Sequence, residues 1–248
     1  MVTQPSRLAL AKLAIDDFLR QTHDERELVI THDGDDACDA ALRAIAAHAS
    51  IRLVRERSGA TLGTLRNVAV DACRGDFVCQ WDDDDRYHPQ RLALQWRALR
   101  KDDADFCFLS DQLHWFPQRR ELFWDDWNRE AYPLNFVQGT LLGRRDLMPR
   151  YPDTARGEDT DVVLQILRDG RRIARLRDAG WCYVYVYHGA NAWDATHHAA
   201  IPRAKAFGHV RLLQRERLLR ARLAEYVPPL GSLHMPHENG VIEIVTPD

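Results

Sequence analysis

The chain has 248 residues, of which 45% are hydrophobic and 29% are charged, and its formal net charge is −3. This is the composition of an ordinary globular protein with enough residues for a substantial core, so it excludes disorder of the chain as a whole. The small negative charge supplies no basic field for nucleic acid, and we expect no nucleic-acid partner.

The cysteines and the apolar segments indicate the compartment. The five cysteines are odd in number and form no C-x-x-C pair, so neither a disulfide framework nor a zinc site is expected. No segment approaches the roughly 20 apolar residues that span a bilayer, and the chain does not open with a charged segment followed by an apolar run. These features predict a cytoplasmic protein with reduced thiols.

The first half of the chain alternates predicted helices and strands. Apolar residues at helical spacing run from Ser6, which is placed to cap the helix, to Thr22. The elements predicted next are a strand at 27–31, a helix at 36–49, a strand at 51–54, a helix at 62–73, a strand at 77–81, a helix at 89–100 and a strand at 105–110. This alternation predicts a single α/β domain with a Rossmann-like, mostly parallel central sheet flanked by helices.

The second half is less regular. It contains a Trp-rich connection through Trp127, a short segment at 140–143, a predicted helix at 158–169 and a β-like run at 181–187. A basic amphipathic helix is predicted at 203–226, and the last twenty residues look irregular except for 241–245. We therefore expect a main domain at 1–200, with halves at 1–100 and 101–200, and a C-terminal helical extension and tail at 201–248.

Acidic residues follow two of the predicted strands. Asp33 comes after the strand at 27–31, and four consecutive aspartates, Asp82 to Asp85, come after the strand at 77–81. Open α/β sheets bind ligands beyond the carboxyl ends of their strands. Four adjacent carboxylates repel one another, and a hard divalent cation with bound phosphate oxygens would relieve this repulsion. The alternative is a solvated acidic turn before a helix that starts near Pro89.

Residues 82–92, Asp-Asp-Asp-Asp-Arg-Tyr-His-Pro-Gln-Arg-Leu, resemble the Asp-x-Asp segment of family-2 glycosyltransferases. Further segments resemble the family in the same order, namely 19–34 with its Asp-Gly turn, Leu-Gly-Thr-Leu-Arg-Asn at 62–67, Arg-Gly-Asp-Phe at 74–77 and Gly-Glu-Asp-Thr-Asp at 157–161. Leu65 departs from the pattern, because the family usually has a small residue there. The resemblance covers roughly residues 1–195.

This resemblance implies a GT-A fold, a nucleotide-sugar donor and Mn²⁺ or Mg²⁺. Residues 1–100 would then be the nucleotide-sugar-binding half and residues 101–200 the acceptor half. The implied substrate-binding residues are Thr3 and Asp33 near the nucleobase, Arg66 near the base or diphosphate, Asp82 near the ribose or metal, and Asp83, Glu158 and Trp193.

The resemblance also implies the metal ligands. Asp84 should be the principal ligand, together with Asp82. Residues 187–198 resemble the H-G-x-N ending of some bacterial members, so His188, His197 or His198 could complete the metal shell, with His197 and His188 favoured. The alternative for each histidine is an ordinary hydrogen-bonding role on a loop.

Asp159 matches the catalytic base of the family. An acceptor hydroxyl is a poor nucleophile, and a positioned carboxylate can remove its proton as the sugar–phosphate bond breaks. An inverting transfer follows from this role. The alternative is that Glu158, Asp159 and Asp161 only stabilise the start of a helix through its dipole.

The expected function is transfer of a sugar from a nucleotide-sugar donor, expected to be UDP-linked, to a glycan or lipid-linked acceptor of a bacterial envelope. One alternative is a sugar-nucleotide nucleotidyltransferase, which would normally have a Gly-rich phosphate loop that residues 3–10 lack. The other is a non-catalytic glycan-binding module, which the joint presence of Asp82, Asp84 and Asp159 disfavours.

Two expectations concern the ends of the chain. The basic helix at 203–222 could contact an anionic membrane surface at the inner face of the membrane, the alternative being a solvated helix packed on the domain. The family opens with a buried strand of about six residues, whereas only Met1 and Val2 precede Thr3. The first strand is therefore either stunted or begins in residues that precede this sequence.

Overall fold

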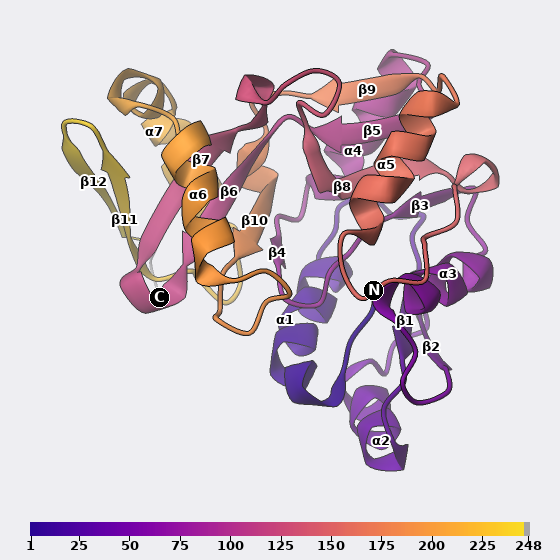
Figure 1. The fold of residues 1–248 in the computed structure, drawn as a ribbon. Helices are drawn as coiled ribbons and strands as arrows, with labels where there is room; N and C mark the ends of the chain where they lie inside the picture. Colours follow the sequence, from indigo (N-terminus) through magenta and orange to yellow (C-terminus); the bar gives the residue numbers. More distant parts are fainter. Residues whose placement is uncertain (246–248) are drawn as a thin grey trace.

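Helices and strands alternate through the first half of the chain, as the sequence predicts, in a computed structural model that describes residues 1–245 (Figure 1). The helices are α1 (Leu8–Leu19), α2 (Asp36–Ile45), α3 (Leu62–Ala72), α4 (Arg91–Lys101), α5 (Glu158–Arg168), α6 (Ala195–Lys205) and α7 (His209–Leu223). The strands are β1 (Leu28–His32), β2 (Ile51–Arg55), β3 (Phe77–Cys79), β4 (Arg86–Tyr87), β5 (Phe106–Leu109), β6 (Asp111–Phe116), β7 (Glu121–Asp126), β8 (Val137–Arg144), β9 (Ile173–Leu176), β10 (Tyr183–Val186), β11 (Ser232–His237) and β12 (Gly240–Val245).

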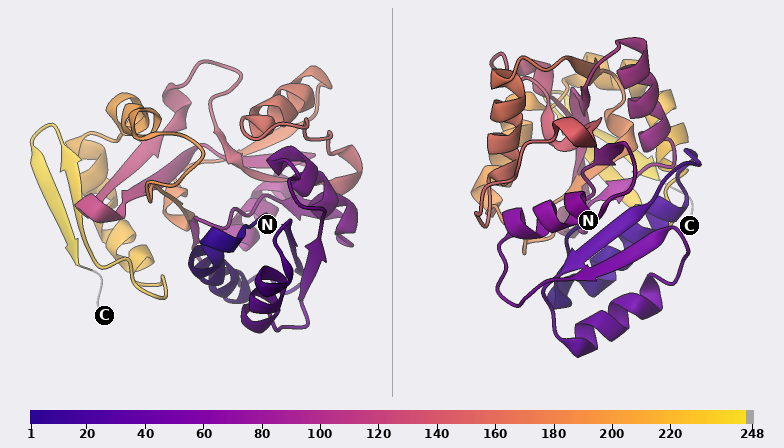
Figure 2. Two further views of the ribbon diagram at one scale, coloured as in Figure 1. Left: turned by 60° about the horizontal axis from the view of Figure 1, so that its bottom comes forward. Right: turned by 90° about the vertical axis from the view of Figure 1, so that its right-hand side faces the viewer.

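The strands of the described residues form three sheets. The parallel pair β1-β2 carries α1, α2 and α3 around it, and a second sheet has the order β3-β8-β5-β9. The third sheet has the order β12-β11-β7-β6-β10-β4. The left view of Figure 2 shows the C-terminal hairpin at one side of the molecule, away from the β1-β2 layer.

Strand pairing is mixed, which differs from the mostly parallel sheet expected from the alternation of elements. β6 and β7 are antiparallel because only the turn at 117–120 separates them, with Arg120 in the left-handed region at φ 53°. Parallel neighbours need a longer crossover, and β10 joins β6 in parallel only after the chain has passed through α5. The Trp-rich connection is thus a hairpin.

Residues 1–3 pair with β1 as a short parallel strand. Val2 forms a bridge with Thr31, and the Thr3 amide donates to the Thr31 carbonyl over 3.0 Å. The predicted cap at Ser6 is wrong, because Ser6 lies in a 3₁₀ turn at 5–7 and α1 begins without a side-chain cap. The chain changes direction at this 3₁₀ turn, between the short strand and α1.

The single basic helix predicted at 203–226 is wrong. The chain forms α6, whose start is capped by Asp194 accepting a hydrogen bond from the His197 amide, and then α7 after Gly208. In the tail, β12 matches the exception expected at 241–245, whereas β11 was not expected. The two strands form a hairpin that extends the third sheet beside β7, and residues 246–248 of the tail lie outside the described residues. Residue 200, where we expected the main domain to end, lies inside α6.

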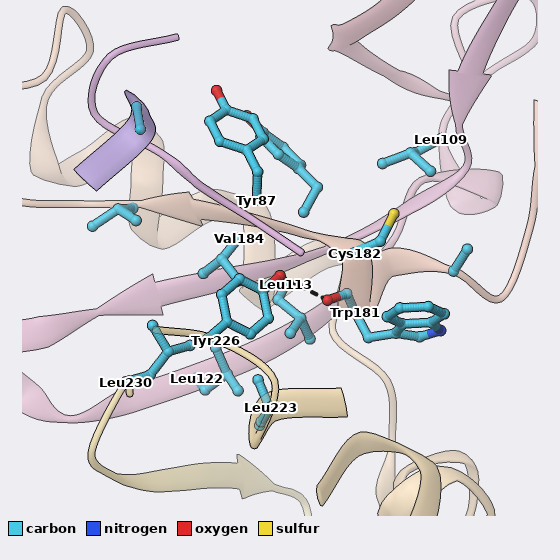
Figure 3. Packing of buried hydrophobic residues seen from close by; sticks show 14 of the residues in the cluster. Tyr87, Leu109, Leu113, Leu122, Trp181, Cys182, Val184, Leu223, Tyr226 and Leu230 are labelled. Atoms are coloured by element: carbon cyan, nitrogen blue, oxygen red, sulfur yellow. Dashed lines mark hydrogen bonds between the residues drawn. The ribbon is translucent and has the colours of Figure 1, made fainter. Parts of the chain in front are cut away.

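One hydrophobic core connects both ends of the chain. It includes Phe18 of α1, Trp124 of β7, Leu219 of α7 and Ile244 of β12. Figure 3 shows part of this core, where the hydroxyl of Tyr226 donates to the Trp181 carbonyl over 2.8 Å. The described residues therefore form a single α/β domain.

Two further expectations can be compared with the described residues. The five cysteines are free thiols in this structure. Across residues 1–245, none of the helices combines the length and apolar character needed to cross a bilayer.

A buried ion pair fastens α1 to β4 and to the C-terminal segment. Asp17 accepts from Arg86 Nε over 2.7 Å and Nη2 over 3.1 Å, and from the Tyr87 amide over 2.9 Å. The same guanidinium donates to the Val227 carbonyl over 3.1 Å. Burial raises the pKa of Asp17 although Arg86 opposes this shift. The pair therefore depends on its hydrogen bonds, because both charges lie out of water.

Replacing Asp17 by Asn should lower the free energy of unfolding by about 3 kcal/mol, because it leaves the Arg86 charge buried without a partner. Asp16→Asn is the matched control, since Asp16 forms an exposed pair with Lys12 one turn away on the same helix. That change should stay within about 0.5 kcal/mol. Urea unfolding of both variants measures the difference, and equal effects would contradict the structural role of the pair.

Candidate active site

A cavity of about 730 Å³ opens beyond β1, β3 and β10. Its lining includes the predicted site residues Thr3, Asp33, Arg66, Asp82, Asp83, Asp84, Glu158, Asp159, Trp193 and His197. His188 is outside the lining, but its Nε2 lies 3.1 Å from Asp84 Oδ2. The structure thus brings together residues that are far apart in the sequence.

The acidic turn after β3 separates its aspartates into different environments. Asp85 points inward, where it accepts from the Tyr183 hydroxyl over 2.5 Å and from the Val186 amide over 2.9 Å. Burial, with the charges of Asp84 and Asp82, raises the pKa of Asp85 well above its ordinary value. Asp85 therefore anchors the turn to β10.

Arg66 of α3 connects the acidic turn to the start of α5. Its Nη2 lies 2.9 Å from Asp82 Oδ1, and its Nε lies 2.8 Å from Glu158 Oε1. Burial raises the pKa of Glu158 despite Arg66, whereas Arg66 and the Gln80 amide lower the pKa of Asp82 against the effect of burial. Asp82 is the carboxylate that this arrangement keeps ionised.

Arg7 supplies the positive charge on the other side of the acidic turn. Its Nη1 lies 3.1 Å from Asp83 Oδ1 and 2.9 Å from Asp84 Oδ2, and its Nη2 donates to the Ala190 carbonyl over 2.9 Å. Burial and the neighbouring Asp84 raise the pKa of Asp83 to about 6 even with Arg7 in contact. One arginine therefore does not fully compensate the charge of the turn.

The donor set of this turn fits a hard divalent cation. Arg7 and His188 both contact Asp84, and burial together with the neighbouring carboxylates raises the pKa values of Asp83 and Asp85. Within residues 1–245, no three His, Cys, Asp or Glu side chains form a cluster that could hold a metal ion by themselves. Mg²⁺ is usually bound through one or two carboxylates together with waters and substrate phosphates, so the fit is to a cation that arrives with a diphosphate.

Asp159 lies at the first turn of α5, on the cavity wall. Gly157 precedes the helix at φ 77°, and Asp159 Oδ1 accepts from the Thr160 amide over 2.8 Å. Burial raises the pKa of Asp159, with Arg66 opposing the shift. The carboxylate thus faces the cavity with a higher proton affinity than a solvated aspartate.

The remaining predicted residues lie at the two ends of the cavity. Asp33 accepts from the Gly59 amide over 2.9 Å, and Thr3 is buried beside Asp83. Trp193 stacks on His197 with ring centroids 4.8 Å apart, and the Arg156 guanidinium lies 5.2 Å from the indole centroid. The cavity therefore has a polar end near the first strands and an aromatic end near α6.

Several lining residues escaped the sequence analysis, namely Arg7, Gln80, Gln112, Tyr183 and Tyr185. The alternation Tyr183-Val-Tyr185-Val predicts a strand with both tyrosines on one face, which was a usable signal for two of them. Arg7 and Gln112 carry no comparable signal, because the sequence places Gln112 in the Trp-rich connection and Arg7 in the first predicted helix.

Solved structures share this fold. A crystal structure of S. aureus TarS residues 1–349 in complex with UDP matches with a TM-score of 0.56 at 14% identity, covering 92% of this chain and 79% of that one. The same TarS region in complex with UDP-GlcNAc matches with a TM-score of 0.56 at 14% identity, covering 91% and 66%. No curated protein sequence matches the chain.

The family model for glycosyl transferase family 2 matches residues 8–144, which is more than half of the chain. The matched stretch contains α3 with Arg66 and the complete acidic turn at 82–85. The α/β, GT-A-type fold expected from the sequence is confirmed by the likeness to TarS. The chain belongs to glycosyl transferase family 2.

Proposed function

We propose that this glycosyltransferase moves a sugar from a UDP-linked donor to a hydroxyl of a glycan or lipid-linked acceptor, with inversion at the anomeric carbon and with Mn²⁺ or Mg²⁺. The observation that carries the proposal is that one cavity holds the Asp82–Asp85 turn, Arg66 and Asp159 together. The TarS structures in complex with UDP and UDP-GlcNAc support the choice of donor.

The donor would bind across the polar end of the cavity. Asp33 and Thr3 would contact the nucleobase, and Asp82, held ionised by Arg66, would contact the ribose or share the cation. Asp83, Glu158 and Trp193 would complete the donor and sugar contacts. Arg66 would gain a diphosphate oxygen as a further partner, because its guanidinium has more N–H donors than its two carboxylate contacts use.

Asp84 would be the principal ligand of the cation, with Asp82, and His188 is the better placed of the two predicted histidines. His188 already contacts Asp84, whereas His197 stacks on Trp193. When bound with the donor, the cation would neutralise charge on the departing diphosphate.

Asp159 would act as general base. Its carboxylate would accept the proton of the acceptor hydroxyl while that oxygen forms a bond to the anomeric carbon and the bond from that carbon to the diphosphate breaks, releasing UDP. A single displacement of this kind inverts the anomeric centre. The alternative role, stabilising the start of a helix, leaves unexplained why burial in a cavity raises the pKa of Asp159.

Family membership disfavours both alternative functions. A sugar-nucleotide nucleotidyltransferase would carry its phosphate loop near residues 3–10, and in this chain residues 5–7 form a 3₁₀ turn whose Arg7 side chain contacts carboxylates. A non-catalytic module would have no use for Asp159 in the cavity wall. Peripheral contact with a membrane stays a prediction; Arg211 and Arg215 of α7 pair with Asp126 and Asp178 within the chain.

A thermal-shift screen tests the proposed donor. With Mn²⁺ present, UDP and UDP-sugars should raise the melting temperature, and GDP, CMP and dTDP compounds should not. A ligand at about 100 times its Kd stabilises by roughly 2.7 kcal/mol, which a thermal shift readily detects. Stabilisation by another nucleotide class alone would assign the donor to that class instead of UDP. If no nucleotide stabilised the protein, the proposed function would be wrong.

Asp84→Ala should abolish Mn²⁺-dependent UDP binding without lowering the stability of the free protein. The crowded turn loses one negative charge, so the remaining carboxylates repel each other less. Calorimetry with UDP and Mn²⁺ measures the first effect and urea unfolding the second. Asp76→Ala, an exposed change at the other end of β3, is the control and should bind UDP normally. Wild-type affinity in Asp84→Ala would place the cation elsewhere.

Asp159→Asn should lower kcat by a factor on the order of 10² to 10⁴ with donor affinity unchanged, since asparagine cannot take the proton. Because burial raises the pKa of Asp159, the wild-type rate should fall on acidification at a pH above the ordinary aspartate range. Asp161→Asn, an exposed change two residues further along α5, should leave both measurements unaltered. A retained anomer in the NMR spectrum of the product would exclude the inverting displacement.

A further inference from the structure

Four polar side chains form a continuous chain from the protein core to the cavity wall. Asp125 Oδ2 lies 3.3 Å from His114 Nδ1, His114 Nε2 lies 3.1 Å from His198 Nδ1, and His198 Nε2 lies 3.4 Å from the Tyr185 hydroxyl. Asp125, His114 and His198 are fully buried. Tyr185 lines the cavity. The proposed transfer chemistry uses none of the four.

The fold holds these four hydrogen-bonded side chains in fixed positions. Asp125, His114 and Tyr185 lie on β7, β6 and β10, which are neighbours in the third sheet, and His114 is the direct register partner of Tyr185. His198 comes from α6, which crosses these strands in Figure 1. The rings of Tyr185 and His198 stack with centroids 4.9 Å apart. Groups fixed by three strands and a helix keep their geometry when a ligand enters.

The buried Asp125 carboxylate sets the direction of every hydrogen bond among these four side chains. A carboxylate at Asp125 can only accept a hydrogen bond, so His114 donates this bond from a protonated Nδ1. A neutral His114 then has a bare Nε2, which must accept from Nδ1 of His198. A neutral His198 likewise has one proton to place, and this proton lies on the Nδ1 that faces His114 Nε2 at 3.1 Å. Its bare Nε2 accepts from the Tyr185 hydroxyl.

The result is a phenol whose proton points inward and whose oxygen lone pairs face the cavity. Such an oxygen accepts a hydrogen bond but does not donate one. Burial and the negative charges of Asp85, Asp84, Asp82 and Asp159 raise the pKa of the Tyr185 phenol and so disfavour a negative charge at this position. An anionic ligand group is therefore disfavoured there, and an uncharged group that donates an O–H is favoured. Gln112, also in the lining, has a buried Nε2 without a hydrogen-bond partner in the described residues.

We propose that Tyr185 receives a hydrogen bond from a sugar hydroxyl in the cavity, and that Asp125, His114 and His198 are positioning residues that fix the direction of this bond. The inference rests on the proposed function in that the ligand is a sugar. The hydroxyl could belong to the donor sugar or to the acceptor, and the experiment separates these two sources.

The first measurement reads the proton order without any ligand. In ¹⁵N NMR spectra of histidine-labelled protein, His198 should carry its proton on Nδ1. Asp125→Asn removes the charge that holds this order, so the proton should redistribute between Nδ1 and Nε2. A wild-type His198 protonated on Nε2 would overturn the proposal.

The second measurement uses UDP, UDP-GlcNAc and methyl β-D-glucopyranoside as probes, each with Mn²⁺. Tyr185→Phe should raise the Kd of one sugar probe roughly 5-fold, as expected for the loss of one hydrogen bond, with UDP unaffected. A change for UDP-GlcNAc alone assigns the bond to the donor sugar, and a change for the methyl glycoside assigns it to the acceptor. Tyr187→Phe is the matched control, because Tyr187 also contacts the His198 ring but lies outside the cavity lining.

The double variant separates positioning from general stability. Asp125→Asn should weaken the same probe as Tyr185→Phe, and it should add nothing in the Tyr185→Phe background. The inference would be overturned if Asp125→Asn weakened sugar binding equally in the wild-type and Tyr185→Phe proteins. It would also be overturned if Tyr185→Phe left both sugar affinities unchanged while UDP still bound. Either result would leave the proposed function standing. A wild-type protein that does not bind UDP would instead remove the proposed function, and the inference would then be judged by the glycoside and the proton order. If Asp125→Asn does not fold, the binding data for Tyr185→Phe alone still test the inference.

Discussion

The contact on which the site depends is the double ion pair of Arg66 with Asp82 and Glu158. Arg66 comes from α3 beside the first sheet, Asp82 from the turn after β3 in the second sheet, and Glu158 from the start of α5. A buried guanidinium between two carboxylates is stable only when its hydrogen bonds are complete, so the three elements have little freedom to move apart. The cavity is the space that they enclose together with β10.

This constraint explains how carboxylates with different tasks coexist within one cavity. Asp82 faces Arg66 and stays ionised, whereas burial leaves Asp159 with a raised pKa. Both carboxylate oxygens of Asp85 are occupied by hydrogen bonds from the Tyr183 hydroxyl and the Val186 amide. Identical side chains thus differ in charge and proton affinity because each has a different neighbour.

The sequence indicates the site better than it indicates the architecture around it. Helices α1 to α5 show clear apolar periodicity, and the acidic turn ends an apolar run, so both could be predicted. The β6-β7 hairpin could not, because β6 is buried on all but one residue and β7, Glu-Leu-Phe-Trp-Asp-Asp, alternates in burial over its first four residues but not in the polarity of its sequence. The start of α6 depends on the Asp194 cap and its separation from α7 on Gly208, and both are weaker signals than the basic periodicity that continues from one helix to the next.

The contacts of Arg7 and the buried Asp125–His114–His198 chain could not be predicted either. Arg7 meets Asp84 and Ala190 only because α1 lies against the loop that follows β10, which is a tertiary contact. His114 and Tyr185 become partners through the register of β6 with β10. Such pairs are set by long-range strand order, which a single sequence does not reveal.

The order of the third sheet has a consequence for biosynthesis. β6 and β7 are complete early in translation, yet their outer neighbours β10 and β11 leave the ribosome much later. Until then both strands present open edges, which attract pairing with other chains. The nascent hairpin is therefore a segment that protection by a chaperone would help, and β10, which closes the edge of β6, brings Tyr183 and Tyr185 to the wall of the cavity.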